Sequence, residues 1–229
     1  MTRLKNIYLA SLAVMLLPAA SHADIVTWTD WTEIGGAAAI GDLGGISVTA
    51  SASGASMDGV SQTGCGTNYW TEPNASDPAY TGGTADNAPT ACEQVGLNSA
   101  VTVNVTFGSS LDNLYMALLS VGQPNVTVTY DFDTEFTVDS DGVGYWSFAN
   151  GGAPGPYVLG AGDTISMNEF HGLLRFDGPI SSLSFTTSPN ENWHAFTFGT
   201  VTSVPEPGTL ALLGAGLIGM GFARRRKAA

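Results

Sequence analysis

The stretch Val101-Thr-Val-Asn-Val-Thr-Phe107 decides the fold class of this chain. Its apolar residues occupy every second position, which places the valines and Phe107 on one face of an extended strand and the polar residues on the other. Such alternation is typical of a β-strand that packs one face on a core and exposes the other to solvent. The stretch therefore predicts an antiparallel sheet with one buried face.

Similar segments recur along the chain. We expect further strands at residues 46–52, 114–121, 126–132, 145–148, 165–176, 180–186 and 193–201. Residues 114–121 are continuously apolar, which predicts a central strand buried on both faces. Turns rich in Gly, Pro, Asn and Asp separate the segments, and no amphipathic helical pattern stands out. The sequence thus predicts an all-β domain over residues 24–203, an antiparallel, jelly-roll-like β-sandwich.

The first 23 residues are organised like a secretory signal peptide. Arg3 and Lys5 form a positive start, residues 7–17 are apolar, and Ser21-His-Ala23 is a small-x-small cleavage site. We therefore expect an exported chain whose mature part begins at Asp24.

The C-terminal tail has three parts in a fixed order. Pro205, Glu206 and Pro207 come first, and an uncharged apolar run follows at 208–223. The last part is a basic cluster, Arg224, Arg225, Arg226 and Lys227. At about 1.5 Å per helical residue the run reaches about 24 Å, which predicts a short transmembrane helix. Basic residues directly after such a run are held on the cytoplasmic side of the membrane.

This tail, residues 204–229, resembles the PEP-CTERM sorting signal of Gram-negative bacteria. Proteins with that signal are exported, held briefly in the inner membrane and processed by an exosortase, in strains that make exopolysaccharide. The resemblance implies an exosortase and, transiently, the inner membrane as partners, and the cell surface or extracellular matrix as the destination. Residues 121–132 and 191–199 also resemble segments of exported PEP-CTERM proteins of unassigned activity.

The charge of residues 24–203 is strongly one-sided. This range holds 19 of the 20 acidic residues but only one of the seven basic residues, Arg175. Such a field repels DNA and RNA and attracts cations, so we expect no nucleic-acid partner. Arg175 lies near Glu169 and Asp177, which predicts a structural ion pair rather than a substrate clamp.

Cys65 and Cys92 are the only cysteines, and both lie in the exported part. An even count in an oxidising compartment predicts a disulfide bond between them. The enclosed residues 66–91 are rich in Gly, Pro, Asn and Asp. We expect them to form a surface excursion that the disulfide bond ties down.

A series of carboxylates is the candidate metal site: Asp131, Asp133, Glu135, Asp139 and Asp141. The first three share one face of a strand, and the turn that follows could fold back toward them, which would suit calcium. EF-hand spacing fails here, because Thr137 and Phe148 stand where acids belong. A solvated acidic face that protects an edge strand is the favoured interpretation. We expect no obligatory cofactor, and calcium is the cation this group would hold.

Aromatic residues are the candidate glycan site. Tyr69 and Trp70 lie in the turn-rich disulfide loop, where exposed rings could stack on a sugar. His171 and His194 lack a metal-ligand spacing, and no Ser or Cys nucleophile motif accompanies them. One of them could pair with a carboxylate as a base, but we expect a hydrogen-bonded structural role for His194 and no catalytic residues.

Three functions follow from these observations. The favoured one is a non-enzymatic surface or matrix protein associated with exopolysaccharide. The alternatives are a carbohydrate-binding module, aided by calcium or not, and a secreted glycan hydrolase with paired carboxylates.

Overall fold

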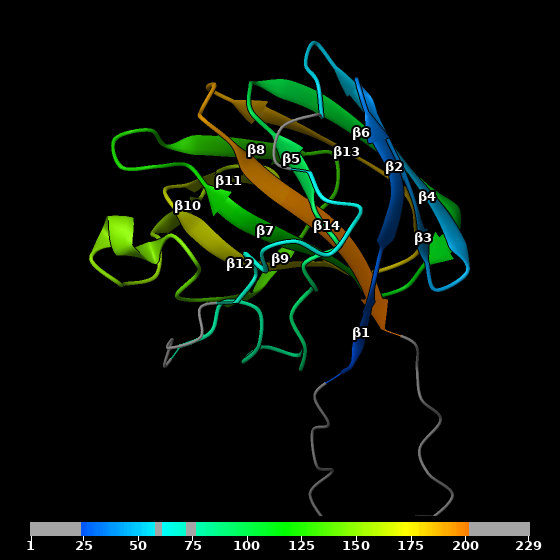
Figure 1. Ribbon diagram of the computed structural model, residues 1–229, viewed down its shortest axis with the longest axis horizontal. Coiled ribbons are helices and arrows are strands. Elements are labelled where there is room, and N and C mark those ends of the chain that lie inside the picture. The colour runs from blue at the N-terminus through cyan, green and yellow to red at the C-terminus, as the bar shows by residue number, and fades with distance from the viewer. Residues whose placement is uncertain (1–23, 58–60, 72–76, 202–229) are drawn as a thin grey trace, which may run out of the picture.

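The computed structural model of the protein describes residues 24–57, 61–71 and 77–201 (Figure 1). These residues form two antiparallel sheets packed face to face, so the predicted all-β sandwich is confirmed. The signal-peptide prediction for residues 1–23 and the helix prediction for the tail lie outside the described residues. Within the described residues, no helix is long and apolar enough to cross a membrane.

The six-stranded sheet has the predicted central strand at its middle. Its order is β1 (Val26–Trp28), β14 (His194–Val201), β7 (Leu114–Val121), β12 (Phe170–Phe176) and β9 (Thr137–Asp141), with β5 (Val95–Leu97) also paired to β14. Every residue of β7 is buried, because β14 and β12 flank it and both of its faces are covered. The prediction of a strand buried on both faces is therefore confirmed.

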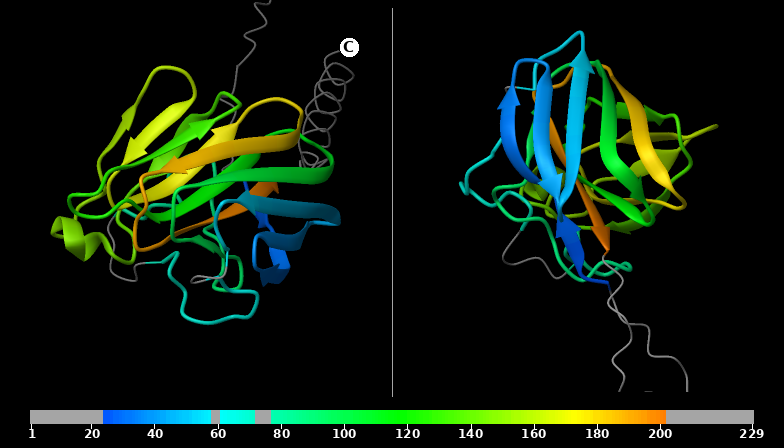
Figure 2. Two further views of the ribbon diagram at one scale, coloured as in Figure 1. Left: turned by 90° about the horizontal axis from the view of Figure 1, so that it is seen from above. Right: turned by 90° about the vertical axis from the view of Figure 1, so that its right-hand side faces the viewer.

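The eight-stranded sheet contains the alternating stretch that predicted the fold. Its order is β10 (Tyr157–Leu159), β11 (Thr164–Met167), β8 (Val128–Phe132), β13 (Ile180–Ser188), β6 (Val101–Leu111), β4 (Ile46–Ser53), β3 (Ala38–Leu43) and β2 (Asp30–Gly35). Along β6 the valines and Phe107 are buried and the residues between them are more exposed. The two sheets lie as layers against each other (Figure 2).

The two ends of the described domain lie side by side. Val26 of β1 pairs with Val201 of β14 (Figure 1). Between β1 and β2 the chain passes from one sheet to the other at the buried Thr29, whose amide and hydroxyl both donate to the Phe198 carbonyl at 2.8 and 2.9 Å. At this crossing the chain leaves the strand with which it was paired. The hydrogen bonds to Phe198 give the buried Thr29 amide a partner there.

Apolar side chains form two clusters. The larger one fills the space between the sheets and contains the stacked rings of Tyr130 and Phe185, 5.2 Å apart. The smaller one covers the outer face of the six-stranded sheet with Trp70 and Tyr80, each 2% exposed. The described part of residues 66–91 is mostly exposed or half-buried and contains no named strand, as expected of a surface excursion, but it also covers the sheet. The described part of this segment supplies a third layer over the sheet, because its scattered aromatic residues pack on β7 and β12.

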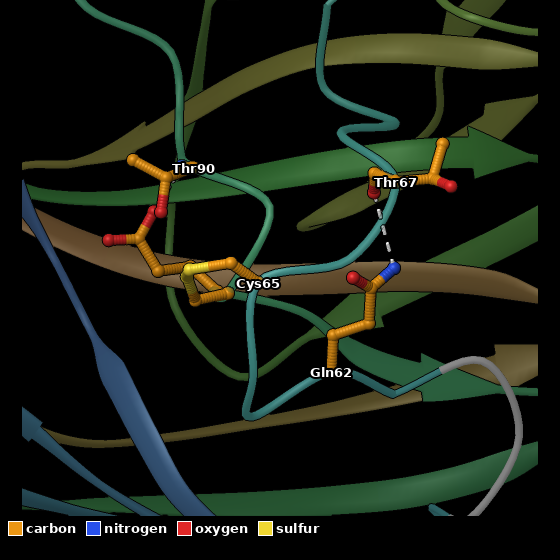
Figure 3. The surroundings of a disulfide bond; sticks show 6 residues. Gln62, Cys65, Thr67 and Thr90 are labelled. Atoms are coloured by element: carbon orange, nitrogen blue, oxygen red, sulfur yellow. Dashed lines mark hydrogen bonds between the residues drawn. A yellow bond between two sulfur atoms is a disulfide. The ribbon is translucent and has the colours of Figure 1, made fainter.

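The disulfide bond between Cys65 and Cys92 is present, as predicted (Figure 3). Gln62 pairs with Gln94 through a 2.8 Å backbone hydrogen bond next to the bridge, and the Gln62 side chain donates to the Thr67 carbonyl at 3.4 Å. The described part of residues 66–91 is called the covering segment below. The bridge thus anchors it next to the start of β5.

Two predicted strands are wrong. Residues 145–148 form a turn that leads into the 3-10 helix η1 (Ser147–Asn150), since Gly144 and Ser147 bond each other across the turn at 2.8 and 3.1 Å. Residues 165–176 form two strands in different sheets. Glu169, at a φ of 50°, turns the chain between them.

Candidate functional site

A pocket of about 200 Å³ opens at one end of the six-stranded sheet. Because neighbouring strands are antiparallel, the end of β7 meets the starts of β12 and β14 at this edge. The pocket is lined by Ser120, Gly122, Gln123, Trp146, Glu169, Glu191, Asn192 and Trp193. It therefore combines hydrogen-bonding groups, two carboxylates and two indole rings.

A β-bulge shapes the backbone at this edge. Phe170 pairs with Val121 and Gly172 with Leu118, so β7 has one residue more than β12 between these pairs. Ser120 and Glu169 both adopt left-handed backbone conformations, at φ of 53° and 50°. Bulges and left-handed non-glycine residues are enriched at functional sites, where they redirect side chains. Here they turn Ser120 and Glu169 into the pocket.

Glu169 and His171 form the first of two buried carboxylate–imidazole pairs. Glu169 is 4% exposed, and its Oε1 accepts a 2.5 Å hydrogen bond from the Ser120 hydroxyl. His171 is fully buried, with its Nε2 3.6 Å from the same Oε1 and its Nδ1 3.1 Å from the Tyr80 hydroxyl. Burial lowers the pKa of His171, and the Glu169 carboxylate only partly opposes this shift. The imidazole is therefore neutral at pH 7.

Glu191 and His194 form the second pair. The Glu191 Oε1 accepts the Gly122 amide at 3.1 Å and contacts the His194 Nδ1. The His194 ring lies edge-on to Tyr130, 5.5 Å between centroids, and burial together with the Glu191 charge raises the pKa of the Tyr130 hydroxyl well above its usual value. Each pair thus anchors a pocket carboxylate to the core through one oxygen.

The two indole rings form a corner. Trp146 and Trp193 meet edge to face, with centroids 4.6 Å apart and planes at 82°. Tyr69 packs behind them, 4.8 Å from Trp146 at an interplanar angle of 27°. Offset and T-shaped contacts of this kind are favourable for aromatic rings. The corner is therefore a fixed wall of the pocket rather than a pair of loose side chains.

The candidate glycan residues have different environments. Tyr69 is half-buried and supports the indole corner, so it lies next to the pocket. Trp70 points into the core, where it packs edge-on against Tyr80 at 5.3 Å. Trp70 therefore offers no ring surface to a glycan, and its assignment to a surface site is wrong.

The candidate metal residues do not form one cluster. Asp131 lies on β8 in the eight-stranded sheet, whereas Asp139 and Asp141 lie on β9 in the six-stranded sheet. Asp133 accepts the Ser184 amide at 2.9 Å, and Glu135 is exposed. Across residues 24–57, 61–71 and 77–201, no three His, Cys, Asp or Glu side chains are placed to hold a metal ion. The alternative in which the turn folds back to complete a calcium site is therefore not found among the described residues, since residues 139–141 belong to β9, an edge strand of the other sheet.

Asp139 and Asp141 have local structural environments instead. Asp139 accepts the Thr84 amide and hydroxyl at 3.0 and 2.6 Å, which ties the covering segment to β9. Burial and the nearby Asp77 carboxylate raise the pKa of Asp141. The Arg175 prediction is confirmed, because its Nε lies 3.0 Å from Asp177 Oδ1.

The pocket itself is a site that the sequence did not indicate. From the sequence, Glu169 was considered only as a neighbour of Arg175, and a pair between a histidine and a carboxylate was considered without naming the carboxylate. A signal was present, because each histidine follows a glutamate at short spacing, in Glu169-Phe-His171 and Glu191-Asn-Trp-His194. The spacing alone could not show that the two segments meet at one sheet edge.

A second hollow, of about 430 Å³, lies on the β2–β3 hairpin. Its lining contains one charged residue, Glu33, and no aromatic ring. It is larger than the pocket at the sheet end but offers fewer convergent groups, so we regard the pocket as the candidate site.

Residues 203–227 match the family model described as the PEP-CTERM protein-sorting motif. The chain carries a PEP-CTERM sorting motif. The motif lies immediately beyond β14, at the end of the strand opposite the pocket. No curated protein and no solved structure matches the chain.

Proposed function

We propose that the chain is a non-enzymatic cell-surface protein that associates with exopolysaccharide. The PEP-CTERM motif marks it as a protein that an exosortase processes, exported with a membrane-anchored sorting signal and delivered to the surface. The observation that carries the remainder of the proposal is the pocket at the end of β7, β12 and β14.

The pocket has the groups that hold a sugar ring. The hydroxyl groups of a sugar donate hydrogen bonds, and the carboxylates of Glu169 and Glu191 are strong acceptors for them. The apolar face of a sugar stacks on an aromatic ring, and Trp146 and Trp193 supply two at right angles. The surrounding sandwich favours no function by itself, so the proposal depends on these side chains.

Their fixed positions favour binding without turnover. The same oxygen of each carboxylate contacts a histidine and accepts a hydrogen bond, from Ser120 in one case and Gly122 in the other. Such contacts fix the orientation of both carboxylate groups. If this pocket binds a sugar, the protein associates with the matrix by acting as a carbohydrate-binding module. The pocket therefore also supports that alternative.

A glycan hydrolase is the second candidate, because two carboxylates line one pocket as they do in glycosidases. Replacing either Glu169 or Glu191 by Gln would then abolish release of reducing ends from the polysaccharide. Under our proposal, the unmodified protein releases none to begin with.

Cosedimentation tests the proposed function. The exported chain, purified in a nonionic detergent, is mixed with exopolysaccharide from the producing cells, in calcium or in EDTA. We expect cosedimentation in both buffers, because the carboxylates suited to calcium are divided between the two sheets. Absence of the protein from the pellet in both buffers would refute matrix association, and loss in EDTA alone would restore calcium as a ligand.

A further inference from the structure

Both pocket carboxylates keep one oxygen, Oε2, without a partner among residues 24–57, 61–71 and 77–201. All interactions of Glu169 and Glu191 with other described residues involve Oε1, from Ser120 and His171 in one case and Gly122 and His194 in the other. Yet the two residues are only 4% and 8% exposed. Neither Oε2 is among the fully buried atoms that lack a partner, so what exposure each carboxylate keeps lies at this oxygen, on the pocket side. A carboxylate oxygen that opens into a pocket is a strong acceptor for the donors of a ligand.

Among the described residues, the pocket lining contains no Lys or Arg, and His194, which contacts Glu191, is buried behind it. His171 is neutral, since burial lowers its pKa. Arg175, the only Lys or Arg in residues 24–203, lies at the opposite end of β12, about 20 Å from Glu169 along the strand. An anionic ligand such as a uronic acid or a sulfated sugar would therefore be repelled by the pocket, whereas a cation would be attracted.

The aromatic corner favours the same kind of ligand. A cation placed over an indole ring is attracted by the negative face of the ring, and tryptophan gives the strongest such contact. Trp146 and Trp193 present two rings at 82° on the wall of a pocket whose other groups include the two carboxylates. Carboxylates together with indole faces are the chemistry that recognises an ammonium group.

We infer that the pocket binds the protonated amino group of an amino sugar, so that the protein selects glycans with free amines. This inference rests on the proposed function and names the ligand class of the same site. The pocket, at about 200 Å³, is below the roughly 300 Å³ of sites for larger ligands, which suits one sugar unit at a chain end or side branch.

Three oligosaccharides of equal length test the inference. Binding of the full exported chain is measured by calorimetry with a glucosamine oligomer, its N-acetylated counterpart and a uronic acid oligomer, at a pH that protonates the amine. We expect the glucosamine oligomer to bind at least tenfold more tightly than the N-acetylated one, and the uronate not to bind. A linear polyamine of equal charge should bind more weakly, because it lacks the ring that stacks on the indoles.

Matched variants separate the pocket from the general acidity of the domain. Glu169→Gln keeps the size of the side chain and an acceptor for Ser120 but removes one charge, and we expect at least a tenfold loss of affinity for the glucosamine oligomer. Glu135→Gln removes the same charge from an exposed position and should have little effect. Trp146→Leu should weaken binding about fivefold, the ratio expected for a cation–π contact of about 1 kcal/mol.

Several results would overturn the inference. Equal losses in the Glu169 and Glu135 variants would mean general charge attraction, and equal binding of the polyamine would remove the sugar from the assignment. Tighter binding of the N-acetylated oligomer would show a site for neutral sugars, and the proposed function would still stand. If no oligomer binds although the exopolysaccharide cosediments, the amino-sugar assignment fails alone. If cosedimentation fails as well, the proposed function fails with it.

Discussion

Gly144 lies so close to His171 that a Cβ on Gly144 would be 2.1 Å from the imidazole Nδ1. The ring cannot move aside easily, because it is fully buried and bonded to Tyr80. The turn before η1 and the start of β12 are therefore fitted to each other without spare volume, next to the pocket that both help to form.

Gly144→Ala should destabilise the domain. Forcing a methyl group into a filled site costs about 1–3 kcal/mol, which for a domain of this size corresponds to a fall in Tm of roughly 2–12 °C. Thermal unfolding followed by circular dichroism measures it. Gly35→Ala is the matched control, since nothing lies within 4 Å of a Cβ there and its Tm should stay near that of the unmodified protein. A Tm for Gly144→Ala as high as that of the control would show that the two elements are loosely packed.

Stability should fall as the pH drops below neutrality, and His171 should cause part of the fall. Its pKa is lower in the folded state than the ordinary value of about 6.5, so below that pH the unfolded chain binds more protons. The stabilising contribution is complete above about pH 6.5 and is lost as the pH falls through the lower pKa of the folded state. Urea unfolding of the unmodified protein and of His171→Asn over this window gives the comparison. A pH profile equally steep in both proteins would assign the dependence to other groups.

Trp70→Ala should mainly affect stability, whereas Trp146→Ala should mainly affect glycan retention. Trp70 is buried in the outer cluster, and its removal should cost roughly 3–5 kcal/mol and lower the Tm sharply. Trp146 is half-buried on the pocket wall, so its removal should weaken glycan retention with a smaller change in Tm. Paired measurements of Tm and retention on immobilised exopolysaccharide distinguish the two. If retention is lost only in the Trp70 variant, the glycan-binding site lies in the disulfide loop and not in the pocket.

Reduction of Cys65–Cys92 should loosen the layer over the six-stranded sheet. Closing a loop of this length contributes about 3–4 kcal/mol in the chain-entropy description. The Cys65→Ser/Cys92→Ser double variant should therefore unfold at a lower urea concentration. Its amides near Trp70 and Tyr80 should exchange faster than in the unmodified protein, by a larger factor than the amides of β7. Hydrogen exchange with mass spectrometry measures both regions. Uniform exchange over the domain would mean that the bridge stabilises the fold as a whole.

Deleting residues 204–229 should change the destination of the protein without unfolding the domain. The motif lies beyond the last strand, and the described domain is closed by the pairing of Val26 with Val201. Cell fractionation should find the truncated protein away from the surface fraction, while its purified form keeps the Tm of the unmodified one. If the truncated protein is found in the same cell fractions as the unmodified one, the tail does not direct sorting.

The sequence predicted what depends on local periodicity. The alternation of β6 and the apolar run of β7 each specify burial within a single strand, and both strands are found where they were expected. Short strands such as β1, β5 and β10 have three residues each, too few to show a period. β1 and β5 form because the long strand β14 offers an edge to both, and β10 pairs with the short strand β11.

The pocket could not be predicted in the same way. Its residues come from the ends of three strands and from the turn before η1, and only the order of the strands in the sheet brings Glu169 and Glu191 together. Trp70 and Trp146 occur in similar turn-rich sequence, and nothing local distinguishes the buried ring from the one on the pocket wall. Likewise, Asp131 and Asp141 are near in sequence, but the chain changes sheets between them.

The position of β14 has a mechanical consequence. The strand runs about 26 Å from the pocket at its first residue, His194, to the tail beyond Val201. While the tail holds the membrane, tension on a captured polymer would pull along β14 and slide it against β7, which loads their perpendicular hydrogen bonds together. Tension between Asp24 and Val201 would instead peel β1 from β14 one pair at a time, because the free ends of both strands lie at the same edge. The fold would thus resist a force that arrives through a polymer held in the pocket.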